Sequence, residues 1–219
     1  MTDRGLAGLG ALTLAAAYLL GIVGVLGPLS TLGLGTPDMN PSAVLALAHH
    51  TPWLLPLFFT VIYDLSALGT GLAAIALARS HSRDLPFLAI ASAAVALIWA
   101  GLAMASGMVA RAGLADLVAL GYTDPERALE TWRLMHLLET GLAGRTEALG
   151  GLWIGLVSFA AMRTGSLSGV VNLIGALVAA AGLVTYIPAL ADLGGMVFGL
   201  GAILWCLWVG VELLLPTPA

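Results

Sequence analysis

The sequence predicts an all-α polytopic membrane protein with six transmembrane helices, short cytoplasmic hairpin turns and one helix at the outer interface. The first observation is composition: 60% of the 219 residues are hydrophobic and 9% are charged, whereas an ordinary soluble domain has about 25% charged residues. The second is the 28 glycines, which add no polar surface. The third is a set of apolar runs long enough to cross a hydrocarbon core of roughly 30 Å. Lipid is therefore the expected solvent.

The six apolar runs are expected to be helices. Each is longer than a buried strand and lacks the alternation of a barrel strand, and a helix satisfies its own backbone hydrogen bonds in lipid. Together they form a single transmembrane bundle over 1–219, in which the first span is retained rather than cleaved as a signal peptide. The expected spans are residues 5–28, 52–78, 86–110, 143–162, 168–190 and 193–214.

Arginine sets the expected orientation, because the chain has no lysine. Short segments on the cytoplasmic side of a membrane protein are enriched in positive charge. If the N-terminus is cytoplasmic, the short inner segments hold Arg4, Arg79, Arg83 and Arg163, and the much longer outer segments hold Arg111, Arg127 and Arg133. The sequence thus predicts a multi-pass protein with both termini in the cytoplasm.

The outer connections carry turn and helix signals. In the longest, 111–142, Asp124 and Pro125 form a helix start, with Glu126 beside the positive helix end. We expect a helix over about 125–140 that lies at the outer interface or extends the fourth span, with Trp132 as an interfacial anchor. The first outer loop, 29–51, is rich in Gly, Pro and Asn and is expected to consist of turns.

Three ionisable residues fall inside the expected spans: Asp64, Arg145 and Glu147. Such residues are costly in lipid unless they are paired or wetted, so each is a candidate functional residue. Asp64 and Arg145 lie at similar expected depth in the outer half of the bilayer, and a weak repeat at an offset of 81 residues aligns them. We therefore expect an Asp64–Arg145 ion pair, either as a structural clamp or as part of a ligand or transport site.

The histidines raise the question of a metal or haem. His49 and His50 precede the second span, while His136 and Glu139 are spaced i to i+3 and share a face of the outer helix. His49, His136 and Glu139 are outer-face candidates for a divalent-metal site. No HxxxH or HExxH spacing occurs, however, so interfacial histidines with ordinary hydrogen bonds are favoured and no metal is assigned. Any cofactor remains open.

Several function classes are excluded or unsupported. The net charge of −4 and the absence of a dense basic patch exclude a nucleic-acid partner. Cys206 is the one cysteine, which excludes an internal disulfide. The chain also lacks a nucleophile elbow, a phosphate loop and a dinucleotide fingerprint.

The C-terminal third resembles a known group of proteins. The stretch from Glu147 through Trp153 to Ser158, then Arg163, and finally residues 197–201 leading to Trp205 resembles a family of uncharacterised bacterial six-helix membrane proteins, grouped as a domain of unknown function. The resemblance covers about 145–214. It implies a six-helix fold in a bacterial inner membrane and singles out Glu147 as part of a shared motif.

Two function classes are expected for such a bundle. The first is a non-catalytic accessory or partner-binding subunit of a larger membrane assembly, favoured by small-residue helix faces and the lack of a reactive constellation. The second is a bundle that binds or transports a small lipophilic molecule in an outer-half polar cavity. A membrane enzyme using the outer-face residues ranks third. The expected partners are the lipid bilayer, other membrane subunits or a lipophilic ligand.

Overall fold

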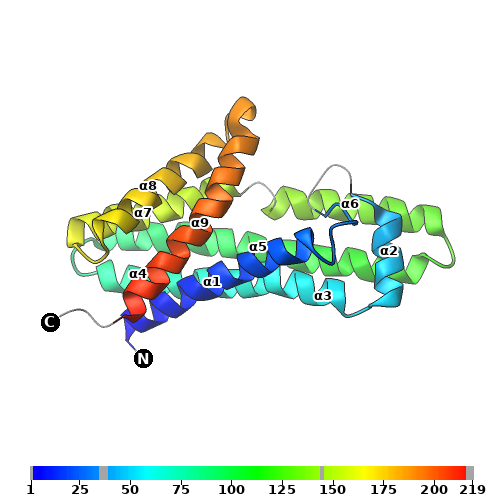
Figure 1. The fold of residues 1–219 in the computed structure, drawn as a ribbon, viewed down its shortest axis with the longest axis horizontal. Helices are drawn as coiled ribbons and strands as arrows, with labels where there is room; N and C mark the ends of the chain where they lie inside the picture. The colour runs from blue at the N-terminus through cyan, green and yellow to red at the C-terminus, as the bar shows by residue number, and fades with distance from the viewer. Residues whose placement is uncertain (1, 35–38, 144–145, 216–219) are drawn as a thin grey trace. The chain divides into compact units, whose positions relative to one another are not determined.

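All regular structure in the described part of the chain is helical (Figure 1). The computed structural model describes residues 2–34, 39–143 and 146–215. Two irregular helices interrupt the α-helices: η1 is a π-helix and η2 a 3₁₀ helix. In chain order the elements are α1 (Asp3–Leu26), α2 (Pro41–His50), α3 (Leu54–Phe59), η1 (Thr60–Leu65), α4 (Ser66–His81), α5 (Pro86–Leu120), α6 (Pro125–Ala143), α7 (Glu147–Thr164), α8 (Gly169–Val184), η2 (Pro188–Leu190) and α9 (Ala191–Leu214).

Four segments of the described chain are long and apolar enough to cross a membrane. They are Asp3–Leu26, Leu54–His81, Pro86–Leu120 and Pro188–Leu214. They correspond to the first, second, third and sixth expected spans. The helices at the fourth and fifth expected spans are shorter: α7 has 18 residues and α8 has 16. The all-α class and a membrane-compatible set of helices are therefore confirmed.

The structure differs from the sequence prediction in three places within the connections expected to be outside. Residues 41–50 of the expected turn region form α2, because the Asn40 side chain accepts a hydrogen bond from Ala43 N and Pro41 occupies the first helical position. Helix α5 continues ten residues beyond the expected end of the third span. Trp132 is buried and donates to Met39 Sδ at 3.1 Å, so it is a core residue of this fold rather than an exposed anchor.

The chain divides into two compact units. Unit 1 comprises the described parts of Met1–Ala16, Ser66–Gly101 and Arg145–Ala219, and unit 2 comprises those of Ala17–Leu65 and Leu102–Gly144. Helices α1 and α5 contribute residues to both units.

Small residues bring the helices of unit 1 into close contact. A β-carbon at Gly151 would lie 2.9 Å from the carbonyl oxygen of Ala179 and 3.0 Å from Gly182 Cα, so α7 and α8 pack almost backbone to backbone. Gly10 and Gly69 make a similar approach between α1 and α4. Such contacts supply the packing that a hydrophobic drive cannot supply in lipid.

Polar contacts gather the chain ends and two turns at one end of unit 1. Arg4 donates to the carbonyl oxygens of Glu212 and Leu213 at 2.7 and 3.1 Å, which satisfies acceptors at the end of α9. Arg79 lies 3.1 Å from Asp3. His81 lies 2.8 Å from Ser166, so the α4–α5 and α7–α8 turns also meet there.

A contiguous hydrophobic core occupies unit 2. The second half of α5 contributes Leu114 and Leu117, and α6 contributes Ala128 and Trp132. Helix α6 begins as the sequence predicts, with Pro125 first and the Asp124 carboxylate accepting from Arg127 N at 3.2 Å. The core is completed by residues of α2, α3 and the chain after α1: Leu29, Leu32, Val44, Ala48, Leu55, Phe58 and Phe59.

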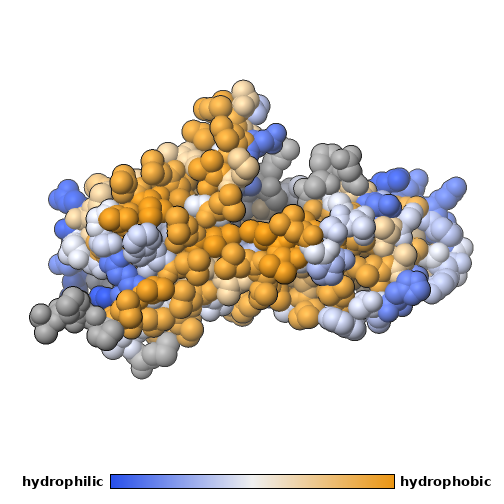
Figure 2. Space-filling view, viewed as in Figure 1, coloured by the Kyte–Doolittle hydropathy of each residue, from blue (hydrophilic) through white to orange (hydrophobic). Residues whose placement is uncertain are grey.

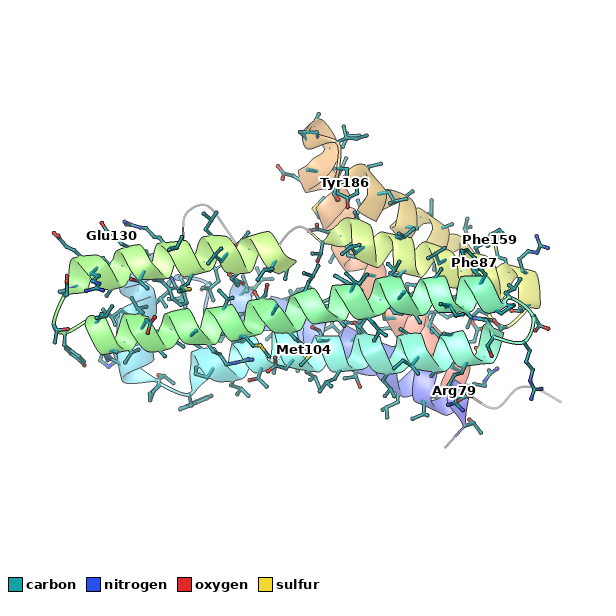
Figure 3. The ribbon with its side chains drawn as sticks, turned by 180° about the vertical axis from the view of Figure 1, so that it is seen from behind. Arg79, Phe87, Met104, Glu130, Phe159 and Tyr186 are labelled. Atoms are coloured by element: carbon teal, nitrogen blue, oxygen red, sulfur yellow. The ribbon has the colours of Figure 1, made fainter. Side chains whose placement is uncertain are left out.

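Large apolar side chains also cover outward surfaces. Figure 2 shows them over α8 and α9, where Leu173, Leu177 and Leu200 are each about 60% exposed. Phe87 on α5 and Phe159 on α7 likewise project away from the ribbon (Figure 3). Surfaces of this kind are suited to contact with lipid.

Candidate functional site

Two neighbouring side chains of α6 form the centre of the candidate site. His136 and Glu139 are three residues apart and therefore share one face of the helix, as predicted. His136 Nδ1 lies 2.9 Å from Glu139 Oε2, and both side chains are mostly buried. On the helix packed beside them, Ser106 Oγ donates to the Glu139 carbonyl oxygen at 2.8 Å, which ties α5 to α6 at this point.

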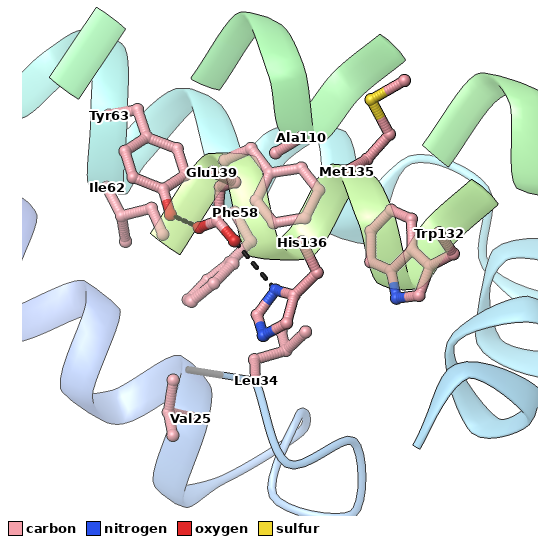
Figure 4. Close-up of a pocket in the computed structure, with 11 residues that line it drawn as sticks. Val25, Leu34, Phe58, Ile62, Tyr63, Ala110, Trp132, Met135, His136 and Glu139 are labelled. Atoms are coloured by element: carbon pink, nitrogen blue, oxygen red, sulfur yellow. Dashed lines mark hydrogen bonds and ion pairs between the residues drawn. The ribbon is translucent and has the colours of Figure 1, made fainter. Parts of the chain in front are cut away.

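The π-helix η1 brings a third polar side chain to this pair. Tyr63 donates its hydroxyl hydrogen bond to Glu139 Oε1 (Figure 4). The π-helix η1 can approach α5 closely because residue 107 of α5 is glycine. A β-carbon there would lie 2.8 Å from Tyr63 Cβ and 3.2 Å from Asp64 Oδ1. Single π-helical turns inside α-helices are often found at functional sites.

The three polar side chains lie on the wall of a cavity within unit 2. Its volume is about 160 Å³. Figure 4 shows the Glu139 carboxylate between Tyr63 and His136, with apolar side chains around them. The remainder of the lining is apolar: Val25, Leu34, Phe58, Phe59, Ile62, Ala110, Trp132 and Met135. A mostly apolar cavity with a few convergent polar groups is the usual form of a small-molecule site.

Asp64 has a partner that the sequence did not predict. Arg111 Nη1 lies 2.9 Å from Asp64 Oδ2, and Arg111 Nη2 donates to Asp64 Oδ1 at 3.1 Å. The two side chains are about 30% exposed. Arg145, the partner expected from the sequence, lies outside the described residues, so the Asp64–Arg145 pair stays a prediction.

Burial shifts both ionisable groups of the cavity toward their neutral forms. It raises the pKa of Glu139 to about 7 and lowers the pKa of His136 from its ordinary value, because removal from water disfavours the charged form of each group. His136 is thus neutral at pH 7, when its Nδ1–H can donate to Glu139. The carboxyl of Glu139 gains or loses its proton near neutral pH.

The raised pKa of Glu139 predicts a pH-dependent stability. The folded protein binds this proton more tightly than the unfolded chain, so the stabilisation is present in acid and is lost as pH rises through about 7. A glutamine side chain has the shape of the protonated carboxyl and does not ionise. In detergent, the Tm of Glu139→Gln minus the Tm of wild type should therefore become larger by a few degrees between pH 5 and pH 8.

Glu130 provides the matched control for that experiment. It lies on the same helix but is exposed (Figure 3). The Tm of Glu130→Gln relative to wild type should stay constant over the same pH range. A constant Tm difference for Glu139→Gln as well would show that Glu139 does not titrate in the folded protein near pH 7.

His49, the other outer-face candidate, does not line this cavity. His49 Nδ1 lies 3.0 Å from the Tyr122 hydroxyl, and the two rings are in contact. Within the ranges that the structure describes, no three His, Cys, Asp or Glu side chains are grouped as metal ligands. In unit 1, Glu147 begins α7, and its Oε1 would lie 3.7 Å from a β-carbon at Gly195.

Two of the three polar side chains of the cavity can be identified from the sequence. His136 and Glu139 were found from their spacing on one helix. Tyr63 was missed because a tyrosine in an apolar run carries no signal of its own, and its hydrogen-bond partner is 76 residues away. The sequence does not indicate Arg111 as the partner of Asp64, because a charge at the expected end of a span predicts the start of a loop.

The arrangement places three hydrogen-bonding side chains on the wall of a mostly apolar cavity. The described lining offers one carboxyl, one imidazole and one phenol, and it contains no Ser, Thr, Cys or Lys. Comparison of the whole chain with protein-family models, with curated proteins and with solved structures finds no match.

Proposed function

We propose that the chain is a six-span protein of a bacterial inner membrane, with both termini in the cytoplasm. The polar contacts that join the two chain ends, the α4–α5 turn and the α7–α8 turn at one end of unit 1 support an even number of crossings. Helix α7 is about 27 Å long at 1.5 Å per residue, close to the hydrocarbon thickness. The arginine distribution supports the orientation, and the bacterial inner membrane is part of this proposal.

The length of α5 favours an outer position for the candidate site. Its 35 residues span about 52 Å, whereas the hydrocarbon core is roughly 30 Å thick. If α5 enters the membrane after the Arg83–Asp84 turn, about 20 residues complete the crossing and Ala110 lies near the outer boundary. Helix α6 fits an outward extension of the fourth span, since its exposed residues change along the helix from charged (Glu126, Arg127, Glu130, Arg133) to leucine (Leu134, Leu137, Leu138) toward that span.

We infer that the unit 2 cavity binds a small, mostly apolar molecule that carries one hydrogen-bonding group. The observation behind this inference is the convergence of Tyr63, His136 and Glu139 on one part of an otherwise apolar wall. The volume of about 160 Å³ suits a single ring, because an engineered cavity of about 150 Å³ binds benzene. Binding of a lipophilic ligand is thus favoured over catalysis.

Filling the cavity should abolish binding. Ala110 is buried in the lining of the cavity, and Ala110→Leu would place three more carbons there. Benzyl alcohol is a suitable probe because it combines one ring with one hydroxyl. Isothermal titration in detergent should show saturable binding of benzyl alcohol to wild type and at least a tenfold loss of affinity in Ala110→Leu.

The control is Ala112→Leu, which adds the same carbons two residues away on an exposed face of α5. This variant should bind benzyl alcohol like wild type, and partition of the probe into micelles is common to all three proteins. Equal binding by wild type and Ala110→Leu would refute the cavity as the binding site.

A second candidate function is that of an accessory subunit, and one feature of α9 favours it. Gly195 and Gly199 form a GxxxG pair, yet a β-carbon at Gly199 would meet no described atom within 4 Å. The surface at Gly199 is therefore open to a transmembrane helix of a partner subunit. If the protein purified in a mild detergent carries a second subunit in constant stoichiometry, the accessory function is favoured.

A further inference from the structure

The unit 2 cavity combines aromatic rings with a carboxylate. Phe58, Phe59 and Tyr63 form a continuous aromatic wall, with ring centroids 6.0 and 6.2 Å apart, and Trp132 adds a fourth ring to the lining. Figure 4 shows the rings of Phe58 and Tyr63 beside the Glu139 carboxylate. Aromatic faces attract organic cations, and they do so most strongly where water is excluded.

The charges around Glu139 favour a cation over an anion. None of the eleven described lining residues is Arg, and the nearby Arg111 is paired with Asp64. His136 on α6 is neutral at pH 7, Tyr63 on η1 and Ser106 on α5 are uncharged donors, and the side chains from α1 and α3 in the wall are apolar. Ionisation of Glu139 therefore leaves the cavity with one net negative charge.

We propose that the cavity takes up a single-ring organic ammonium ion in exchange for the proton of Glu139. This inference rests on the proposed function and names the class of its ligand. Below about pH 7 the carboxyl of the empty cavity is protonated and neutral. In the occupied cavity the carboxylate and the ammonium ion form a neutral pair, so neither state buries an uncompensated charge.

The ligand can reach the carboxylate without displacing its present partners. An ionised carboxylate has about four acceptor positions, and Tyr63 and His136 occupy two of them. The ammonium N–H groups can use the others while the ring packs against the aromatic wall. The two existing donors hold the carboxylate in place and stabilise its ionised form when the cation is bound.

The experiment compares benzylamine, which is predominantly protonated between pH 6 and pH 8, with neutral benzyl alcohol of nearly the same shape. Titration calorimetry on the full chain in detergent should show that benzylamine affinity falls about tenfold from pH 8 to pH 6, as Glu139 takes up its proton near pH 7. Benzyl alcohol affinity should not change. At pH 7, titrations in two buffers of different ionisation enthalpy should show about half a proton released per benzylammonium bound.

Two variants assign the effect to Glu139. In Glu139→Gln, benzylamine should bind no better than benzyl alcohol and should lose its pH dependence, whereas benzyl alcohol binding is retained and shows an intact cavity. In His136→Gln the preference for benzylamine at high pH should persist, because the carboxylate remains. A pH slope that survives in Glu139→Gln would overturn the exchange.

The two proposals fail in different ways. If benzyl alcohol binds but benzylamine binds no better and shows no pH dependence, the exchange is wrong and the lipophile site stands. If neither probe binds to wild type at either pH, both the exchange and the proposed binding function are wrong.

Discussion

Replacing Gly182 by alanine is expected to destabilise the α7–α8 hairpin by about 3 kcal/mol, at the upper end of the usual range for overpacking. The added methyl group would overlap the carbonyl oxygen of Glu147 and would lie 2.9 Å from Gly151 Cα. Both are backbone atoms of α7, so no side-chain rotation relieves the overlap. The two helices must move apart, and the loss of close contact removes the packing that holds them together in lipid.

Thermal unfolding in detergent measures this effect, and Gly101→Ala provides the control. Gly101 lies in the interior of α5, and a β-carbon there would meet no described atom within 4 Å. Alanine at this position should leave Tm unchanged or raise it slightly, because alanine is the better helix former. Similar Tm values for the two variants would mean that α7 and α8 do not pack through Gly182.

The glycine contacts show what a small-residue motif can predict. Gly151 and Gly155, spaced GxxxG, both face α8. Gly195 and Gly199 have the same spacing, but a β-carbon at Gly199 would have open space around it. The motif therefore predicts a surface suited to close helix contact, while the choice of the opposing helix depends on the fold of the whole chain.

The long apolar helices were easier to predict than the segments between them. Uninterrupted apolar length identified all four membrane-compatible segments, because hydrocarbon imposes that length on any helix that crosses it. The length required to cross hydrocarbon sets no limit on where a helix must end, so a charge after an apolar run does not mark the end of a helix. The extension of α5 from Arg111 to Leu120 and the helix α2 were missed for this reason, although Asn40 and Pro41 carried a cap signal.

The candidate site was predictable only where its residues share one helix. His136 and Glu139 are joined by local spacing, whereas Tyr63 reaches them through the approach of η1 to α5 at Gly107. That approach depends on a π-helical turn, which leaves no periodic signal in the sequence. Comparison of depths along straight helices predicts Arg145 as the partner of Asp64. It leaves out Arg111, because the sequence predicts a loop at that position.

Neutralising one member of the Asp64–Arg111 pair should cost more than neutralising both. Asp64→Asn or Arg111→Gln leaves a partly buried charge without its partner, and we expect each single variant to lose about 2 kcal/mol of stability. This figure is below the 3–5 kcal/mol typical of fully buried pairs, since the side chains are about 30% exposed. The double variant should lose less than the sum of the singles, with a coupling energy of at least 1 kcal/mol in a double-mutant cycle.

The Arg79–Asp3 pair of unit 1 is the natural control, because its side chains are 70% and 39% exposed. Its cycle should give a coupling energy near zero, as is usual for exposed pairs.

The Asp64→Asn variant should also weaken benzyl alcohol binding, since Asp64 and Tyr63 are adjacent in η1 and both lie against Gly107. Equal coupling energies for the two pairs would show that Asp64 and Arg111 do not fix η1 against α5. In that case the hydrogen bond to Glu139 would hold Tyr63 in place without help from the ion pair.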